Sequence, residues 1–556
     1  MARIMRRLEN IDTVQPVADP LAQVAIEDNL AWVLEDAARR HGSRNFLQFD
    51  DVALSFDEVD RWANRVANGL QALSVGHGDR VAIMLENCPE FVLAWFGANK
   101  LGAVEVSVNT AYQGMSLRYI LEQCGASVLI VAADFLGAVE PELESLPSLR
   151  SVVVVGTPPS THASGLNLIS WSDFESYSDS FNSQVSPIDV SMFGYTSGTT
   201  GPSKGVMVPH NRIVKTGRDA AMLRGINPDD TLMTCLPLFH GNAKYHTVLP
   251  ALAVGCRAVL TGRFSASRFW SDIRRYKATQ FNYLGVMISI LLKSEPGPKD
   301  HEHAVRLAFG AGAGTTLLEK FEQRFGVFLM EAYGLTEGGV ALANRRDDRR
   351  LGSCGKPMPG YEVEVVDAWD NPVSPGTEGE LVLRSRRPYT TMLGYYRMPE
   401  ETAQTYRNFW LHTGDLARKD TDGFFYFVDR KKDAIRRRGE NISTFEIEAV
   451  VNSHPEIVES AAYAVPAEVG EDDVMVTAVL REGSHMSVDE LHGFCLERMP
   501  YFWVPRYIDL SEEPLPRTPT NKIEKYKLRQ TGVRSGTWDA DRSGATTSSR
   551  RTGVRK

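Results

Sequence analysis

The sequence contains few cysteines, and they form no pattern. Six are scattered through 556 residues without a C-x-x-C pair. This spacing indicates neither a zinc knuckle nor a disulfide framework, so we predict reduced cysteines with mostly structural roles. They are Cys88, Cys124, Cys235, Cys256, Cys354 and Cys495.

Long apolar runs and an excess of positive charge are also absent. No apolar run approaches the roughly 18 residues that a membrane-spanning helix needs, which excludes such a span. Lys and Arg total 61 against 70 Asp and Glu, for a formal net charge of -9. That sign is wrong for a protein held on nucleic acid by general electrostatics. We therefore expect a cytoplasmic protein with no nucleic-acid partner and no membrane span.

The chain does contain the composition and pattern of a large globular protein. Its 556 residues are more than a domain with a single hydrophobic core usually contains, so at least two domains are expected. Short β-branched runs such as 80–85 and 127–132 alternate with amphipathic stretches such as 56–73 and 115–124. This alternation predicts an α/β fold with parallel-rich sheets, and short strands with turn signals after about residue 355 predict a β-rich module.

The most informative stretch is 195-YTSGTTGPSKGVMVPH-210. Its glycines let backbone amides approach an anion, its small hydroxyls add donors, and Lys204 adds positive charge, a combination that suits a polyphosphate. The alternative is a surface loop in which Gly and Ser only permit turns. The stretch is not a P-loop of the form G-x-x-x-x-G-K-[ST], because Ser203 precedes Lys204 and Gly205 follows it.

Together with five later segments, this stretch resembles the adenylate-forming superfamily of acyl-CoA synthetases, luciferases and peptide-synthetase adenylation domains. The resemblance extends over residues 25 to 530, and in its last two segments it is most similar to the crotonobetaine/carnitine-CoA ligase-like branch. The five segments are 332-AYGLTEGG-339, 379-GELVLRS-385, 412-HTGD-415, 429-DRKKDAIRRRGENIS-443 and 516-PRTPTNKIEKYKLR-529.

The resemblance also implies a domain organisation. We expect a large N-terminal domain at 1–428, a hinge at 429–433 with Lys432 at its pivot, and a small mobile α+β lid domain at 434–530. Residues 531–556 are rich in Gly, Ser, Thr and Arg without apolar periodicity, so we predict a disordered tail there.

The resemblance implies catalytic and nucleotide-binding residues from several segments. Lys204, Lys522 and His240 are the expected catalytic residues, although a structural histidine is a serious alternative for His240. Glu337 and Thr196 are expected to bind Mg²⁺, which prefers a few hard oxygen ligands. The expected nucleotide-binding residues are Thr196, Ser197, Gly198, Thr199, Thr200, Gly201, Lys204, Gly310, Ala311, Gly312, Ala332, Tyr333, Gly334, Thr336, Asp415, Arg430 and Lys522.

Individual roles follow from the same resemblance. Tyr333 is expected to stack on adenine, Thr336 to bind phosphate, and Asp415 to accept hydrogen bonds from both ribose hydroxyls. From the residues alone, a turn containing a solvated Glu337 and a helix-capping or turn role for Asp415 remain open.

The expected coenzyme A (CoA) residues follow the hinge. Arg438, Gly439 and Glu440 resemble the loop that lines the pantetheine passage. The sequence departs from the family at Asn521, where glycine is usual beside the adenylation lysine. Asn tolerates left-handed backbone better than other residues with a side chain, so the loop is expected to form.

The implied function is an ATP-dependent acyl-CoA ligase that uses Mg²⁺ and forms an acyl-adenylate from a small-molecule carboxylic acid. Three alternatives stay open. The first is a free-standing adenylation enzyme that loads a carrier protein. The second is a P-loop-type NTPase, which the flanks of Lys204 disfavour, and the third is a catalytically silent nucleotide-binding module, which the intact Lys204, Glu337, Asp415 and Lys522 disfavour. A homo-oligomer also stays open. The acid pocket is expected around 238–246, 282–287, 310–314 and 333–341, with His246 interpreted as structural.

Overall fold

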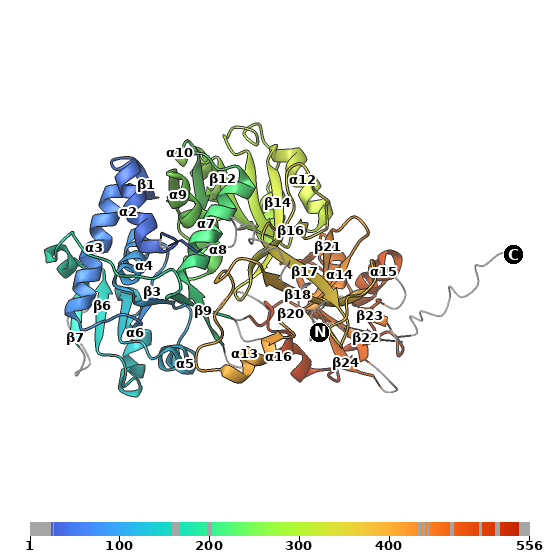
Figure 1. Ribbon diagram of the computed structural model, residues 1–556. Coiled ribbons are helices and arrows are strands. Elements are labelled where there is room, and N and C mark those ends of the chain that lie inside the picture. The colour runs from blue at the N-terminus through green and yellow to red at the C-terminus, as the bar shows by residue number, and fades with distance from the viewer. Residues whose placement is uncertain are drawn as a thin grey trace, which may run out of the picture.

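The computed structural model in Figure 1 describes most of the chain. Two sheets form the N-terminal part, a smaller antiparallel sheet follows, and the C-terminal part lies at one side (Figure 1). The described residues are 24–25, 27–157, 167–196, 203–430, 435–437, 440–442, 444–467, 472–499, 503–517 and 523–543.

The first large sheet has seven strands in the order β7-β6-β5-β3-β4-β8-β9, all parallel except β8 with β9. Its strands are β3 Arg80–Met84, β4 Val104–Ser107, β5 Val128–Ala132, β6 Ser151–Val155, β7 Asn167–Ser170, β8 Val190–Tyr195 and β9 Gly205–Pro209. Its helices are α3 Phe56–Ala72, α4 Pro89–Leu101, α5 Gly114–Cys124 and α6 Leu136–Val139, with short 3-10 turns at Ala133–Phe135, Glu140–Ser145 and Trp171–Ser176. Val81 and Ile83 enter the core that contains α4, whereas Ala82 and Met84 enter the core that contains α5. Burial on both faces explains the continuous apolar runs in these strands.

The second large sheet has nine strands in the order β16-β15-β14-β13-β12-β10-β11-β1-β2. The strands are β1 Asn45–Phe49, β2 Val52–Ser55, β10 Thr231–Thr234, β11 Arg257–Leu260, β12 Gln280–Leu284, β13 Leu307–Ala311, β14 Phe328–Leu335, β15 Gly339–Ala343 and β16 Lys356–Pro357. The helices are α2 Leu30–His41, α7 His210–Arg224, α8 Gly241–Ala243, α9 Leu249–Val254, α10 Ala266–Tyr276, α11 Gly285–Leu292 and α12 Thr315–Phe325, with a π-helical turn at Lys244–Val248. Strands β1 and β10 to β14 are parallel, so their carboxyl ends share one edge.

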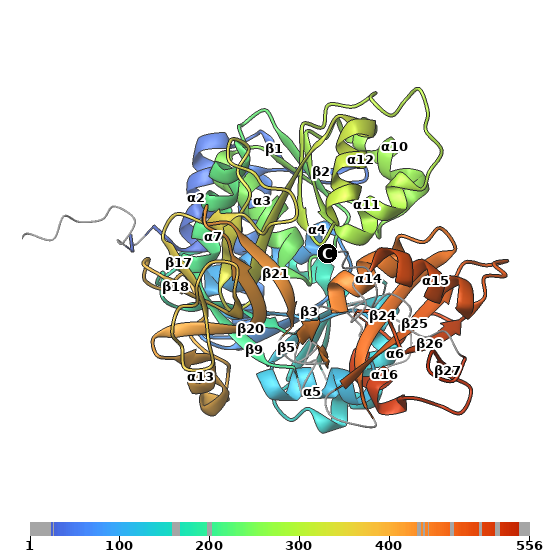
Figure 2. The same cartoon turned by 90° about the vertical axis from the view of Figure 1, so that its right-hand side faces the viewer.

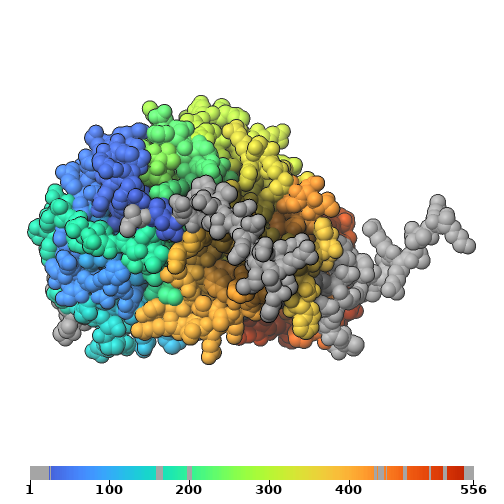
Figure 3. Space-filling view, viewed as in Figure 1, coloured from blue at the N-terminus to red at the C-terminus, as the bar shows by residue number. Residues whose placement is uncertain are grey.

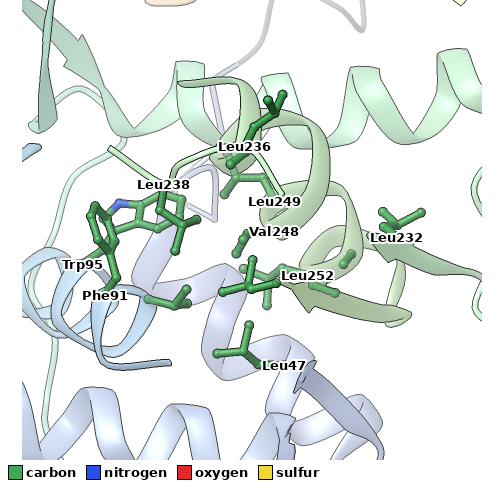
Figure 4. Close-up of a cluster of buried hydrophobic side chains, with 14 of the residues drawn as sticks. Leu47, Phe91, Trp95, Leu232, Leu236, Leu238, Val248, Leu249 and Leu252 are labelled. Atoms are coloured by element: carbon green, nitrogen blue, oxygen red, sulfur yellow. The ribbon is translucent and has the colours of Figure 1, made fainter. Parts of the chain in front are cut away.

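One continuous core joins the two large sheets. Figure 4 shows Leu47 of β1 and Leu232 of β10 in the same cluster as Phe91 and Trp95 of α4, with Leu252 of α9 between them. These side chains are almost completely buried. The two sheets therefore pack as one body, which holds their strand ends in fixed relative positions.

The β-rich module is antiparallel, as its alternating strands and turns predict. Its strands are β17 Tyr361–Val366, β18 Glu378–Ser385, β19 Tyr406–Arg407, β20 Trp410–Lys419 and β21 Phe425–Arg430, and its helix is α13 Pro399–Thr405. Strand β20 pairs with β18, β19 and β21, so it lies in the interior of this sheet.

The C-terminal part packs beside this module, as Figures 2 and 3 show in orange to red. Its elements are β22 Ile435–Arg437, β23 Glu440–Ile442, α14 Thr444–Asn452, β24 Ile457–Pro466, β25 Asp472–Leu480, α15 Val488–Arg498, β26 Tyr507–Ser511, α16 Lys525–Thr531 and β27 Trp538–Asp539. Strands β24 to β27 form one sheet in chain order, and β22 pairs with β23.

The prediction of a disordered tail from residue 531 is wrong for residues 531–543. Trp538 and Asp539 add β27 to the edge of the C-terminal sheet, antiparallel to β26. Arg506 forms ion pairs with Asp539 at 3.2 Å and with Asp541 at 3.1 Å, and the Trp538 ring packs 4.8 Å from the ring of His492. These contacts give a polar segment specific partners that its composition does not reveal. Residues 544–556 lie outside the described part of the chain.

The predicted fold class is confirmed: the protein has parallel-rich α/β sheets, a β-rich module and a separate smaller C-terminal part. All six cysteines are free. Within the described residues, no helix combines the length and apolarity needed to cross a membrane. The predicted hinge stays a prediction, because residues 431–434 lie outside the described residues.

Candidate active site

Thr196 and Lys204, at the two ends of the glycine-rich part of the 195–210 stretch, lie side by side. Thr196 follows β8 and Lys204 precedes β9, and these two strands are antiparallel neighbours. The backbone N–H of Thr196 donates to the carbonyl oxygen of Lys204 at 3.2 Å. The predicted phosphate-binding residues Ser197, Gly198, Thr199, Thr200 and Gly201 lie outside the described residues, so their role stays a prediction.

Helix α5 contacts both ends of this stretch. The side-chain oxygen of Gln123 accepts a hydrogen bond from the Tyr195 hydroxyl, and the Tyr119 hydroxyl donates to the carbonyl oxygen of Ser203 at 2.9 Å. Tyr119 and Gln123 are four residues apart, which places them on the same face of the helix. One helix face therefore positions the start and the end of the glycine-rich stretch.

Tyr395 connects the predicted phosphate-binding lysine to the predicted metal-binding carboxylate. The Nζ atom of Lys204 lies 4.8 Å from the centre of the Tyr395 ring, within the range of a cation–π contact. The Tyr395 hydroxyl donates to Oε1 of Glu337 at 2.8 Å. Burial, followed by the charge of Glu337, raises the pKa of Tyr395 well above its usual value, so the hydroxyl keeps its proton.

A buried arginine holds the turn that carries Thr336 and Glu337 between β14 and β15. Arg212 of α7 donates to the carbonyl oxygens of Leu335 at 3.4 Å and Glu337 at 3.2 Å. Thr336 lies against β8, because a Cβ added at Gly194 would come within 2.7 Å of its methyl group. Both predicted residues therefore lie beside the start of the glycine-rich stretch.

Asp415 is almost fully buried and binds two other predicted nucleotide residues. Its Oδ2 accepts from the Tyr333 hydroxyl at 2.6 Å, and its Oδ1 lies 2.9 Å from Nε of Arg430. Asp415 and Arg430 are directly paired on β20 and β21. Burial and then the Asp415 charge raise the pKa of Tyr333. The structure thus brings these three residues together, while the predicted stacking of Tyr333 on adenine stays untested.

The other predicted glycine segment ends β13. Gly310 and Ala311 are among the last residues of the strand, and Gly312 follows with φ +81, a conformation that favours glycine. A Cβ added at Gly285 would lie only 1.8 Å from the carbonyl oxygen of Gly312. The first turn of α11 therefore packs directly against this segment and fixes its path.

Glu331 is a charged residue at the carboxyl edge of the nine-stranded sheet that the sequence analysis missed. Its Oε1 accepts a hydrogen bond from the backbone N–H of Ala313 at 3.1 Å. Burial is the main cause that raises the pKa of Glu331 from 4.5 to about 7. Its position directly before 332-AYGLTEGG-339 was the only available signal.

Replacing Glu331 with glutamine is expected to stabilise the protein at alkaline pH only. Because the folded-state pKa is raised, the folded chain keeps a proton between pH 4.5 and 7 that the unfolded chain releases. Wild-type stability therefore falls as pH rises through that window, whereas glutamine does not ionise and still accepts from Ala313. The variant should exceed wild type by about 1 to 2 kcal/mol near pH 8 and match it near pH 4.5. Urea unfolding across this range measures the difference, and a difference that does not change with pH would contradict the assignment.

His240 and the C-terminal predictions are less fully described. His240 precedes α8 and is half-buried, and its ring lies 4.9 Å from the Phe239 ring. The predicted roles of His240 in catalysis and of Glu440 in CoA binding therefore remain predictions. Lys432, Arg438, Gly439, Asn521 and Lys522 lie outside the described residues, as does the side chain of Glu440.

The segment that follows Lys522 is anchored within the C-terminal part. Nζ of Lys525 lies 2.7 Å from Oε1 of Glu448 and donates to the Thr444 hydroxyl at 2.6 Å. The backbone N–H of Thr444 in turn donates to Oδ2 of Asp429 at 2.5 Å. These contacts connect the C-terminal part to β21 across the predicted hinge.

The donor set fits Mg²⁺ bound chiefly through substrate phosphates. Across the described residues, no group of three or more His, Cys, Asp or Glu side chains is arranged to hold a metal ion alone. Mg²⁺ is usually bound by one or two carboxylates together with phosphate oxygens and water, and Glu337 would supply one such carboxylate.

The arrangement can therefore hold a polyphosphate and a ribose at adjoining strand ends. Tyr395 and Arg212 were missed by the sequence analysis, because the stretch 391-TMLGYYRMPE-400 and the start of α7 carry no recognisable chemical pattern. Only their contacts with Lys204, Leu335 and Glu337 reveal them.

Comparison with protein families gives two matches that together include most of the chain. The family described as AMP-binding enzyme matches residues 34–396, and the AMP-binding enzyme C-terminal domain matches residues 446–522. Among curated proteins, a crotonobetaine/carnitine–CoA ligase of Salmonella paratyphi B is 32% identical over 511 residues, which cover 90% of this chain and 99% of that protein.

Solved structures that resemble this chain include a CoA ligase and a CoA synthetase. The anthranilate CoA ligase AuaEII in complex with anthranoyl-AMP is 28% identical with a TM-score of 0.83, covering 95% of this chain and 99% of its own. The o-succinylbenzoate CoA synthetase of Bacillus subtilis, in complex with its acyl-adenylate intermediate, is 26% identical with a TM-score of 0.79, covering 90% and 98% of the two chains.

Proposed function

Because this chain belongs to the AMP-binding enzyme family and is an acyl-CoA ligase, we propose that the strand ends around Lys204, Glu337 and Asp415 form its adenylation site. The overall reaction joins a carboxylic acid to a thiol at the expense of ATP. The acid carboxylate attacks the α-phosphate of ATP, which releases pyrophosphate and forms an acyl-adenylate. The thiol of CoA then displaces AMP to give the thioester.

The protein's own groups contribute position and charge. Lys204 and the predicted Lys522 offset negative charge that develops on the phosphates, and preorganised charges of this kind commonly provide the largest part of catalysis. Mg²⁺ held by Glu337 would neutralise phosphate charge further. Tyr395 and Arg212 orient Glu337, and α5 orients the two ends of the glycine-rich stretch.

Asp415 is proposed to bind the ribose. Its carboxylate is held by Tyr333 and Arg430 from two different strands, so its oxygens have a fixed direction. A carboxylate has acceptor capacity beyond these two contacts and suits a pair of neighbouring hydroxyls.

One observation carries the proposal. Lys204 and Glu337 come from distant parts of the chain, and both contact Tyr395. Lys204 lies over its ring and Glu337 accepts from its hydroxyl. This juxtaposition supports a site in which Lys204 contacts the phosphates of ATP and Glu337 binds their Mg²⁺.

The decisive assay incubates the protein with Mg²⁺, ATP, CoA and pooled carboxylic acids, and follows AMP and new CoA thioesters by mass spectrometry. Acid-dependent AMP together with a thioester is the expected result. AMP without a thioester would favour a carrier-protein acceptor instead of CoA. Absence of AMP with every acid would contradict the proposed function.

Replacing Asp415 with asparagine is expected to raise the KM for ATP roughly 10- to 100-fold, because hydrogen bonds to charged groups contribute about 1.5 to 3 kcal/mol. Steady-state kinetics with varied ATP measure the effect. Asp420→Asn is the matched control, because Asp420 lies in the turn after β20 and pairs with Arg350. An unchanged KM in Asp415→Asn would remove Asp415 from the nucleotide site.

A further inference from the structure

Four buried polar atoms gather on one face of the nine-stranded sheet, and none has a hydrogen-bond partner within the described residues. This face is covered by α7 and the π-helical turn Lys244–Val248. Buried polar atoms almost always have partners, so a cluster of exceptions indicates a bound ligand or water. The four atoms are Nδ1 of His246, Oδ1 of Asn282, Nη2 of Arg224 and Nε2 of Gln280.

His246 and Asn282 contribute hydrogen-bond acceptors. Burial, and then the Arg224 charge, lowers the pKa of His246 to about 3, so its ring is neutral and keeps an accepting nitrogen. Its ring centre lies 4.5 Å from that of Phe309, which pairs with Asn282 in the sheet register. The Asn282 amide N–H donates to the Thr247 hydroxyl at 2.8 Å, which leaves Oδ1 as the unpartnered acceptor.

Arg224 and Gln280 contribute donors and a positive charge. Nε of Arg224 donates to the side-chain oxygen of Gln280 at 2.9 Å, and Nη1 donates to the carbonyl oxygen of His246. The remaining Nη2 and the Gln280 amide nitrogen are the unpartnered donors. Among the described residues Arg224 forms no ion pair, so the cluster carries net positive character.

This mixture of groups selects among ligand chemistries. A hydroxyl both donates and accepts, so it can bind donors and acceptors together. A carboxylate only accepts and would meet the Asn282 oxygen unfavourably. A trimethylammonium group neither donates nor accepts, needs an aromatic or acidic cage, and would here meet the positive charge of Arg224.

The depth of the cluster limits the size of the ligand. Leu284, at the end of β12, is 46% exposed, and Asn282 lies two residues earlier on the same strand face. At about 3.3 Å per residue, Asn282 is about 7 Å below the strand edge and Gln280 about 13 Å below it. The neighbouring edge of β13 carries Gly310 and Gly312, where the nucleotide and the reacting carboxylate are proposed to lie.

We propose that the acid used by this enzyme is a compact hydroxy acid, whose hydroxyl lies at the end remote from the carboxylate, donates to one of the acceptors His246 and Asn282, and accepts from Arg224 or Gln280. The inference rests on the proposed function and names its substrate class. It also reverses the structural role assigned to His246 from sequence. It also predicts that this enzyme does not use acids with a trimethylammonium group.

The test uses matched acids with two carbon skeletons, one aromatic and one aliphatic. The ring series is 4-hydroxybenzoate, 4-methylbenzoate and 4-(trimethylammonio)benzoate, and the chain series is 5-hydroxypentanoate and hexanoate. In at least one of the two series, kcat/KM for acid-dependent pyrophosphate release should be about 100-fold higher for the hydroxy acid than for its methyl counterpart. In at least one of the variants His246→Phe and Asn282→Leu this preference should fall below about 10-fold, because the group that accepts the hydroxyl proton is lost.

His303→Phe is the matched control, because Nε2 of His303 is also buried without a partner in the described residues but stacks on Trp270, 4.9 Å away. It should keep the preference of wild type. Equal or better use of the methyl or trimethylammonium acid would overturn the inference while leaving the ligase intact, and would assign the cluster to water. Turnover of other pooled acids but of neither hydroxy acid would overturn it as well. Absence of AMP with every acid would instead overturn the proposed function itself.

Discussion

Glu337→Gln is expected to lower acid-dependent pyrophosphate release about 1,000-fold at saturating ATP, the scale on which a single preorganised electrostatic group acts. Glutamine keeps the size of the side chain and can still accept from the Tyr395 hydroxyl at the position of the present 2.8 Å bond. It removes the negative charge that is proposed to bind Mg²⁺. The variant should also need more Mg²⁺ for half-maximal activity, which a magnesium titration at fixed ATP measures.

Tyr395→Phe separates the charge of Glu337 from its orientation. Phenylalanine keeps an aromatic ring facing Lys204 and removes the hydroxyl that holds Glu337. A loss of about 10-fold is expected, because one hydrogen bond to a charged group is lost. A Glu337→Gln variant that stays within 10-fold of wild type, with an unchanged magnesium requirement, would show that Glu337 does not bind the metal. Unchanged urea unfolding in both variants would confirm that the fold is intact.

Lys244→Met is expected to lower the free energy of unfolding by about 3 to 5 kcal/mol, because it leaves a buried carboxylate without its partner. Nζ of Lys244 lies 2.7 Å from Oε2 of Glu105 and donates to the Ser107 hydroxyl at 2.7 Å, and neither charged side chain is exposed. The ammonium group also lies 5.0 Å from the Phe91 ring centre and 4.8 Å from the Trp95 ring centre, and both rings are drawn in Figure 4. Urea unfolding measures the loss.

The double variant Lys244→Met with Glu105→Leu distinguishes the pair from packing alone. It removes both charges, so it should recover at least half of the stability lost in Lys244→Met. Arg275→Met is the surface control, because Arg275 and Asp51 form an exposed ion pair at 2.8 Å and such pairs contribute about 1 kcal/mol or less. A loss below about 1 kcal/mol in Lys244→Met would contradict the importance of the buried pair.

The sequence predicted the fold class and many residues of the proposed site, because both depend on local patterns. Alternating β-branched and amphipathic runs predicted the parallel-rich sheets, since strand and helix periodicity are properties of neighbouring residues. Asp415, Tyr333, Thr336 and Glu337 were found in short motifs, and the structure brings the first two into direct contact.

Other features depended on contacts that no local pattern encodes. The tail looked disordered by composition, yet Trp538 and Asp539 form an edge strand because Arg506 and His492 provide partners on distant elements. Glu331 became a group of raised pKa only because β14 places it in a half-buried position beside Ala313.

By itself, the sequence determined the α/β architecture, the resemblance to adenylate-forming enzymes and the residue types of the proposed nucleotide site. Only the tertiary structure decided that Tyr395 joins Lys204 to Glu337, and that His246 and Asn282 form a buried polar cluster. The physical reason is that motifs record which residues stand close along the chain. Hydrogen bonds, burial and the pairing of charges depend on which distant segments the packed sheets bring together.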